Sequence, residues 1–188
     1  MTIKPILYTL LFLTLVSCTH VHNEIRNLMG KHVRIPIDEM ICWNSGTSSV
    51  VKQGDAIKEY TYVVYLDSAI CSSCNIKEFG LWNDLIDKMP NAQFVFIVAP
   101  HHKEDVTHIP LYLEKSGIES RVYIDDKYKF AEANPFFPES YIYHTVLLDK
   151  NNRIILVGSP LRNPKLEKLA MSIVNDDSVK VATQMPCP

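Results

Sequence analysis

The order of apolar segments predicts an α/β fold: a central mixed sheet, helices on both of its faces and a C-terminal antiparallel hairpin. Short β-branched and aromatic runs alternate with amphipathic helical segments, which is typical of a mostly parallel sheet covered by helices. Near the C-terminus, two apolar runs flank turn residues, which indicates a hairpin. The chain has 188 residues, 47% apolar and 21% charged, which suits one domain with a sizeable core.

Strands are predicted where short apolar runs are bounded by polar or turn residues. In chain order, the expected strands cover residues 32–37, 40–43, 60–66, 92–99, 121–124, 141–148 and 153–157. The first is expected to stop at Pro36. Residues 149–152 supply the turn of the terminal hairpin.

Helices are predicted where apolar residues recur at three- and four-residue steps. The clearest case starts at Cys74 and ends before Pro90, with an apolar face made of Phe79, Trp82, Leu85, Ile86 and Met89. Shorter helices are expected over residues 24–29, 109–115 and 127–133. A last helix is expected to begin at the N-cap residue Asn163, with Pro164 at its first position.

The N-terminus has the pattern of an export signal. Lys4 precedes an apolar run of about a dozen residues, which is short for a membrane span and right for a signal-peptide core. The run ends in Leu15-Val16-Ser17-Cys18, which resembles the lipobox of bacterial lipoproteins. The resemblance implies that residues 1–17 are a lipoprotein signal peptide and that Cys18 carries a lipid anchor. The alternatives are a soluble secreted protein or an incidental Cys18.

The rest of the chain divides into three parts. Polar residues 18–56 are expected to form a tether and N-terminal extension, residues 57–175 the folded domain, and residues 176–188 a tail without a clear period. A formal net charge of -2 gives no basic footprint, so no nucleic-acid partner is expected. The protein is expected in the cell envelope, on the periplasmic side, lipid-anchored to a membrane.

The sequence Cys71-Ser72-Ser73-Cys74 follows the strand over residues 60–66 and opens the amphipathic helix. Unpaired N–H groups and the positive dipole end at a helix start stabilise a thiolate. Cys71 is therefore the predicted attacking thiol, and Cys74, one turn on, the predicted resolving thiol. A structural zinc site would want a second pair or nearby histidines. A passive Cys71–Cys74 disulfide is the other alternative.

Three segments, YVVYLDSAICSSCNIKEFGLW, QFVFIVAP and YHTVLLDKNNRIILVG, resemble the thioredoxin fold in its extracytoplasmic TlpA/ResA-like form. They are most similar to thioredoxin-like lipoproteins of the Bacteroidetes, and the resemblance covers residues 57–175. It implies a thiol–disulfide oxidoreductase without a cofactor. Its partners would be protein thiols or disulfides in the cell envelope, and Cys71 and Cys74 would be its catalytic residues.

The sequence also departs from this family. Ile70 stands where the family usually has Trp, and Ser72 and Ser73 stand where Pro is frequent. Lys77 occupies a position where Glu is frequent. Tyr65 occupies the position of the buried carboxylate of thioredoxin, and Asp67 is the carboxylate nearest to it in the sequence. Tyr143-His144 occupies the place of the family's cis-proline. A cis bond at a non-proline residue costs about 3 kcal/mol, so a trans bond is expected there.

His144 has three interpretations. It could lower the pKa of Cys71 by charge pairing, join the two thiols as a metal ligand, or be a strand-end histidine without a role. Asp67 and Lys77 are further candidates to tune the thiol. Five aromatic residues could line an apolar rim for a partner, although core packing suits most of them: Trp43, Phe136, Phe137, Tyr141 and Tyr143.

Cys42 and Cys187 remain unassigned. They could form a disulfide between the N-terminal extension and the tail, provided that their Cα atoms come within about 7 Å.

Three functions stay open. The first is a membrane-tethered thiol–disulfide oxidoreductase that acts on exported proteins. The second is a non-catalytic thioredoxin-like lipoprotein that serves as a binding module in an envelope complex. The third is a copper- or haem-delivery protein whose metal binding depends on His144. The redox direction, the partner and the choice of inner or outer membrane are not fixed by the sequence.

Overall fold

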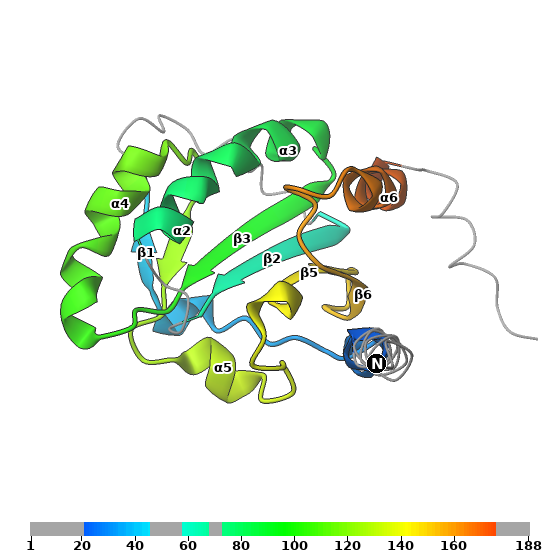
Figure 1. The fold of residues 1–188 in the computed structure, drawn as a ribbon, viewed down its shortest axis with the longest axis horizontal. Helices are drawn as coiled ribbons and strands as arrows, with labels where there is room; N and C mark the ends of the chain where they lie inside the picture. The colour runs from blue at the N-terminus through cyan, green and yellow to red at the C-terminus, as the bar shows by residue number, and fades with distance from the viewer. Residues whose placement is uncertain (1–20, 46–57, 68–72, 176–188) are drawn as a thin grey trace, which may run out of the picture.

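A six-stranded mixed sheet forms the centre of the protein. The computed structural model describes residues 21–45, 58–67 and 73–175. The strands are β1 (Ile41–Trp43), β2 (Tyr60–Leu66), β3 (Ala92–Val98), β4 (Val122–Ile124), β5 (Thr145–Leu148) and β6 (Ile154–Val157). Their order across the sheet is β1-β4-β3-β2-β5-β6 (Figure 1). The three middle strands β4, β3 and β2 are parallel, and β1, β5 and β6 each run antiparallel to a neighbour. The predicted fold class is confirmed.

The central strand β2 is buried on both faces, which explains its uninterrupted apolar sequence. Because side chains alternate along a strand, Tyr62, Val64 and Leu66 pack into the core on one face. Val63 and Tyr65 pack into the core on the other face. Strand β3 has the same burial pattern as β2, with which it pairs along its whole length.

Four helices cover the first face: α2 (Ser73–Lys77), α3 (Asn83–Lys88), α4 (Ile109–Ser116) and α6 (Pro164–Asn175) (Figure 1). The single helix expected between Cys74 and Pro90 is interrupted by a 3-10 segment, η2 (Glu78–Trp82). The predicted apolar face is nevertheless present, because Phe79, Trp82, Leu85 and Met89 are all buried. Another 3-10 segment, η3 (Lys103–Thr107), precedes α4. The predicted N-cap of α6 is confirmed by a hydrogen bond from Leu166 N to Asn163 Oδ1.

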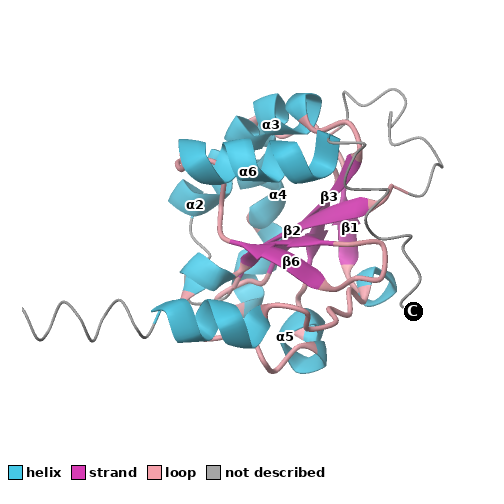
Figure 2. Cartoon of the chain, turned by 90° about the vertical axis from the view of Figure 1, so that its right-hand side faces the viewer, coloured by secondary structure: helices cyan, strands magenta, loops and turns pink. Residues whose placement is uncertain are grey.

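The opposite face is covered by α5 (Lys129–Ala133), by the helical residues 21–28 and by the 3-10 segment η4 (Tyr141–Tyr143) (Figure 2). Its core includes Leu28, Val33, Phe130 and Tyr143. Residues of the N-terminal extension therefore pack into the same core as the strands. Within the described residues, no helix is long and apolar enough to cross a membrane.

Two of the strand predictions are wrong in part. Residues 32–37 form only an isolated antiparallel bridge, between His32 and Arg153, followed by the 3-10 segment η1 (Ile37–Glu39). In the expected strand 141–148, the first residues instead form η4, because Tyr143 N donates to Ser140 O and His144 N donates to Tyr141 O. Strand β5 therefore begins only at Thr145.

Candidate functional site

The end of β2 and the start of β5 bring two predicted site residues together. These strands are antiparallel, with Val64 opposite Thr145, and Tyr65 N donates to His144 O at 3.0 Å. Asp67 follows the last residue of β2, and His144 precedes the first residue of β5. As a result, both residues lie at the same end of these two neighbouring strands.

His144 is 4% exposed, and each of its two ring nitrogen atoms contacts a polar group of the protein. Its Nε2 atom lies 2.7 Å from Pro138 O, and its Nδ1 atom lies 3.1 Å from Asp67 Oδ2. The Nδ1 contact is at ion-pair distance but lacks the alignment of a hydrogen bond. The rings of Tyr65 and Phe137 complete the surroundings, with centroids 5.4 Å and 5.9 Å from that of His144.

The Pro138 carbonyl determines which nitrogen of the His144 ring carries a hydrogen toward it. A carbonyl oxygen only accepts hydrogen bonds, so Nε2 carries the hydrogen that faces Pro138 O. Nδ1 is left facing the Asp67 carboxylate at 3.1 Å. The ends of β2 and β5 thus bring an imidazole and a carboxylate into contact.

A groove of about 690 Å³ opens beside this strand end. Its lining comes from β2, α2, η2, η4, the first residue of β5 and the segment between β6 and α6: Val64, Tyr65, Leu66, Asn75, Glu78, Phe79, Trp82, Tyr141, Ile142, Thr145, Ser159, Leu161, Arg162 and Asn163. Aromatic and aliphatic side chains dominate it. Tyr141 and Ile142 are among its most exposed apolar residues, at 58% and 47%. The groove therefore offers apolar surface to a ligand or polypeptide.

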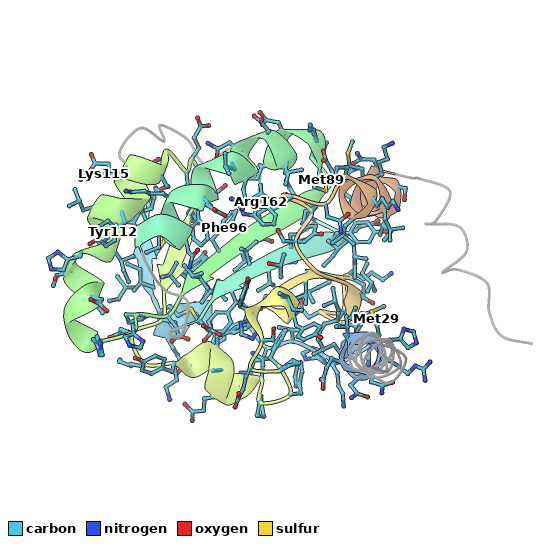
Figure 3. All side chains as sticks on the ribbon, viewed as in Figure 1. Met29, Met89, Phe96, Tyr112, Lys115 and Arg162 are labelled. Atoms are coloured by element: carbon cyan, nitrogen blue, oxygen red, sulfur yellow. The ribbon has the colours of Figure 1, made fainter. Side chains whose placement is uncertain are left out.

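An ion pair joins two of the groove-lining elements. Arg162 Nη2, in the segment before α6, contacts Glu78 Oε1 on η2. Arg162 is labelled in Figure 3. Sequence reasoning missed Glu78, Arg162 and Asn75 as groove residues. The only available signal was that Asn75 and Glu78 follow Cys74 on one helical segment, whereas nothing in the sequence pairs Glu78 with Arg162.

Comparison with solved structures identifies the architecture. The solution structure of a thioredoxin-like protein in the oxidized form matches with a TM-score of 0.53 and 15% identity, over 78% of this chain and 98% of that chain. The fold is thioredoxin-like. The thiol:disulfide interchange protein DsbE from Chlorobium tepidum gives a TM-score of 0.47 at 20% identity, covering 78% of this chain and 96% of that chain. The thioredoxin domain of a thiol-disulfide oxidoreductase from Bacteroides vulgatus gives 0.46 at 19% identity, covering 78% and 98%. No family model and no curated protein matches the sequence.

The predicted cysteine pair falls largely outside the described residues of this thioredoxin-like fold. Cys71 lies outside them, and so do Ile70 and Ser72. Cys74 is the second residue of α2, and its side chain is not described. Its neighbour Asn75 lines the groove. Lys77, the third tuning candidate, is exposed at the last residue of α2.

The predicted aromatic rim is present in part. Tyr141 lines the groove of the thioredoxin-like domain, whereas Tyr143 is buried in the core. Phe136 and Phe137 pack against the core on the α5 side of the sheet, and Trp43 packs against the core on the other side. The Tyr143–His144 and His144–Thr145 bonds are trans, since the described part of the chain contains no cis peptide bond.

The remaining cysteine and metal predictions have partial outcomes. Cys42 is exposed on β1 and has no disulfide partner among the described residues. Cys187 and Cys18 lie outside the described residues, so the Cys42–Cys187 disulfide and the lipid attachment stay predictions. Among the described side chains, no group of three or more His, Cys, Asp or Glu residues could hold a metal ion.

Proposed function

We propose that this chain is a membrane-tethered thiol–disulfide oxidoreductase that acts on exported protein thiols or disulfides through Cys71 and Cys74. One observation carries the proposal: described residues on both sides of the Cys-x-x-Cys sequence line one apolar groove. Asn75, the residue after Cys74, lines that groove together with the last residues of β2. A polypeptide bound in the groove would therefore contact the two elements that the cysteine-bearing sequence joins.

The exchange needs only the two thiols and the partner's disulfide. The Cys71 thiolate attacks one sulfur of that disulfide, which forms a mixed disulfide and releases the partner's other sulfur as a thiolate. Cys74, after losing its proton, attacks the Cys71 sulfur and releases the partner's second thiolate. Two electrons pass from the cysteine pair to the partner. The reverse sequence oxidises a dithiol partner, and the relative potentials of the two couples set the direction.

The Asp67–His144 pair is the proposed tuning group for this exchange. In this proposal His144 tunes the Cys71 thiol through the charge of its ring, and Asp67 lies against Nδ1 of that ring. The 3.1 Å separation of Nδ1 and Oδ2, together with the burial of the ring, supports these roles. Lys77, exposed at the end of α2, is the competing source of positive charge.

The location follows from the N-terminal sequence. In this proposal, residues 1–17 direct export, Cys18 carries the lipid, and the domain acts on the periplasmic side of the cell envelope. Lipidation with several acyl chains holds a protein on a bilayer, whereas a single chain does not. The partner is a protein whose thiols or disulfide are exposed in that compartment.

A redox titration with thiol trapping tests the enzyme. The Cys71–Cys74 pair is expected to cycle between dithiol and disulfide with one two-electron potential. A Cys74→Ser variant should accumulate mixed disulfides with partners in cells, and a Cys71→Ser variant should accumulate none. Cys42→Ser is the matched control, because Cys42 is an exposed thiol on a different edge of the sheet. A pair that no dithiol reductant can cycle excludes this function.

The competing function is a non-catalytic binding module in an envelope complex. The observation that favours it is the anchoring of His144, whose ring is buried and held between Pro138 and Asp67 at the place expected for the family's proline. A binding module predicts that a Cys71→Ser variant retains full function in cells and that partner binding depends on the groove residues Tyr141 and Ile142.

A further inference from the structure

The N-terminal extension is docked on the domain along most of its described length. Gly30 N donates to Ile154 O at 2.8 Å, and Ile154 N donates to Lys31 O at 2.9 Å. Val33 N donates to Asn152 O at 2.8 Å, while Leu28 and Val33 are buried in the core. Only two residues, Thr19 and His20, separate Cys18 from Val21 in the sequence, and three chain steps span at most about 11 Å.

This docked segment and the hairpin turn beside it carry an excess of positive charge. Residues 21–34 and 149–153 contain five Lys or Arg residues and two Asp or Glu residues, a net charge of +3 in a chain of net charge -2. We define the basic strip as the five cations, all of them exposed: Arg26, Lys31, Arg34, Lys150 and Arg153. The remainder of the chain therefore carries a net charge of -5.

The two acidic residues neutralise the strip only in part. Asp149 uses Oδ1 to accept hydrogen bonds from Asn151 N and Arg153 N, so its carboxylate also holds the hairpin turn together. Glu24 is half-buried. Two exposed apolar side chains belong to the same segment, Val21 at 40% and Met29 at 43%. Met29 is labelled in Figure 3. Cations beside exposed apolar side chains are the composition of surfaces that lie on anionic bilayers.

We propose that the basic strip binds the surface of an anionic phospholipid bilayer. Two observations select a bilayer as the occupant: the charge of the strip, and the short stretch of chain between it and Cys18. The second of these rests on the proposed lipid attachment, whereas the first is independent of it. The basic strip then holds the domain against the bilayer surface, and the domain does not move freely at the end of a tether.

The test uses a chain of residues 19–188, which keeps every described residue and lacks the lipid. Its sedimentation is measured with vesicles of phosphatidylcholine containing about one third phosphatidylglycerol, and with vesicles of phosphatidylcholine alone. We expect binding to the anionic vesicles at 50 mM salt that is lost at 500 mM, and no binding to the neutral ones. Each strip cation removed should weaken binding about fivefold, the equivalent of about 1 kcal/mol.

Matched triple variants locate the surface. Arg26→Gln/Lys31→Gln/Lys150→Gln should bind about 100-fold more weakly. Lys115→Gln/Arg121→Gln/Lys165→Gln removes the same charge from exposed positions outside the strip and should keep the binding. Figure 3 places Lys115 across the molecule from Met29. Thermal unfolding checks that both triple variants fold. Amide hydrogen exchange of the vesicle-bound protein checks that residues 21–34 become protected on binding.

Three results would overturn the proposal: equal binding to neutral and anionic vesicles, equal weakening in the two triple variants, or no binding at 50 mM salt. Redox cycling of Cys71 and Cys74 is measured on the same samples. Failure of that cycling with intact vesicle binding rejects the oxidoreductase and keeps the surface. Loss of vesicle binding with intact cycling rejects the membrane-binding surface and keeps the oxidoreductase.

Discussion

Asn134 and Arg34 lie 100 positions apart in the chain and exchange two hydrogen bonds. Arg34 N donates to Asn134 Oδ1 at 2.9 Å, and Asn134 Nδ2 donates to Arg34 O at 2.8 Å. The same Nδ2 group donates to Phe130 O at 2.8 Å. The buried amide thus pairs with the N-terminal segment as a neighbouring strand would, and it fastens that segment to the end of α5.

Replacing Asn134 should destabilise the whole domain. In Asn134→Ala, three hydrogen bonds are lost and buried backbone groups are left unpaired, so we expect the free energy of unfolding to fall by about 2–3 kcal/mol. Urea unfolding measures it. Asn151→Ala, at an exposed turn position, is the control and should change the free energy by less than about 0.5 kcal/mol. Equal effects of the two substitutions would contradict the assigned role of Asn134.

The proposed tuning role of His144 predicts a change in thiol reactivity. Removing an imidazolium charge from the surroundings of a thiolate raises the thiol pKa, so His144→Gln should slow alkylation of Cys71 at pH 7. A rise of one unit would slow it about tenfold. Alkylation rates are measured between pH 5 and 9 by mass spectrometry. Lys77→Gln is the matched variant; a change confined to Lys77→Gln would assign the tuning to the lysine.

Gly80 is predicted to tolerate no side chain. A Cβ atom at this position would overlap the carbonyl group of Ser116 at the end of α4. Gly80→Ala should therefore lower the free energy of unfolding by about 3 kcal/mol, because either the 3-10 segment or α4 must move. Gly117→Ala is the comparison: Gly117 has a φ of 71° with open space around it, so only backbone strain of about 1 kcal/mol is expected. Thermal unfolding of both variants ranks the two effects.

Tyr62 carries a buried hydroxyl for which the described residues offer no hydrogen-bond partner. Tyr62→Phe keeps the ring, which stacks on Phe94 with centroids 5.5 Å apart, and removes the unpaired oxygen. We expect the variant to be more stable by about 1 kcal/mol at pH 7 in urea unfolding. A loss of stability would show that the hydroxyl has a partner after all.

The same residue makes stability depend on alkaline pH. Burial raises the pKa of Tyr62 above its ordinary value of 10.0. In the unfolded chain the phenol ionises near its ordinary pKa, while in the folded protein it stays protonated. The free energy of unfolding is therefore unaffected by this titration well below pH 10 and declines as the pH rises further. Between pH 9 and 11, the free energy of unfolding should decline less steeply with pH for Tyr62→Phe than for the native chain.

Local sequence determined the buried strands well because both faces of β2 and β3 are covered. Tyr60–Leu66 is predicted to the residue, since every position from Tyr62 to Leu66 is buried. The sequence predicts one continuous helix after Cys74, because the apolar residues recur at three- and four-residue steps without a break. The 3-10 segment that interrupts it contains Gly80, which packs closely against Ser116, a tertiary contact that no local pattern reports.

The site was predictable in its residues but not in its geometry. Asp67 and His144 could be named as candidates from the family resemblance, Asp67 as the carboxylate nearest Tyr65 and His144 at the place of the cis-proline. Their contact depends on β2 pairing with β5 in a particular register, with Val64 opposite Thr145. The Pro138 carbonyl that holds the ring is a backbone group, and the Glu78–Arg162 pair spans 84 positions. Neither leaves a signature in the sequence.

The N-terminal segment contacts both edges of the sheet. Residues 30–33 bond to β6 and the turn before it, and β1 pairs with β4 at the far edge (Figure 1). A pulling force applied at the N-terminus would therefore act first on the bonds of Gly30, Lys31 and Val33, and reach β1 only after these had broken. Mechanical load from the proposed lipid anchor would be absorbed at the β6 edge, which leaves the β2–β5 junction with Asp67 and His144 unstrained.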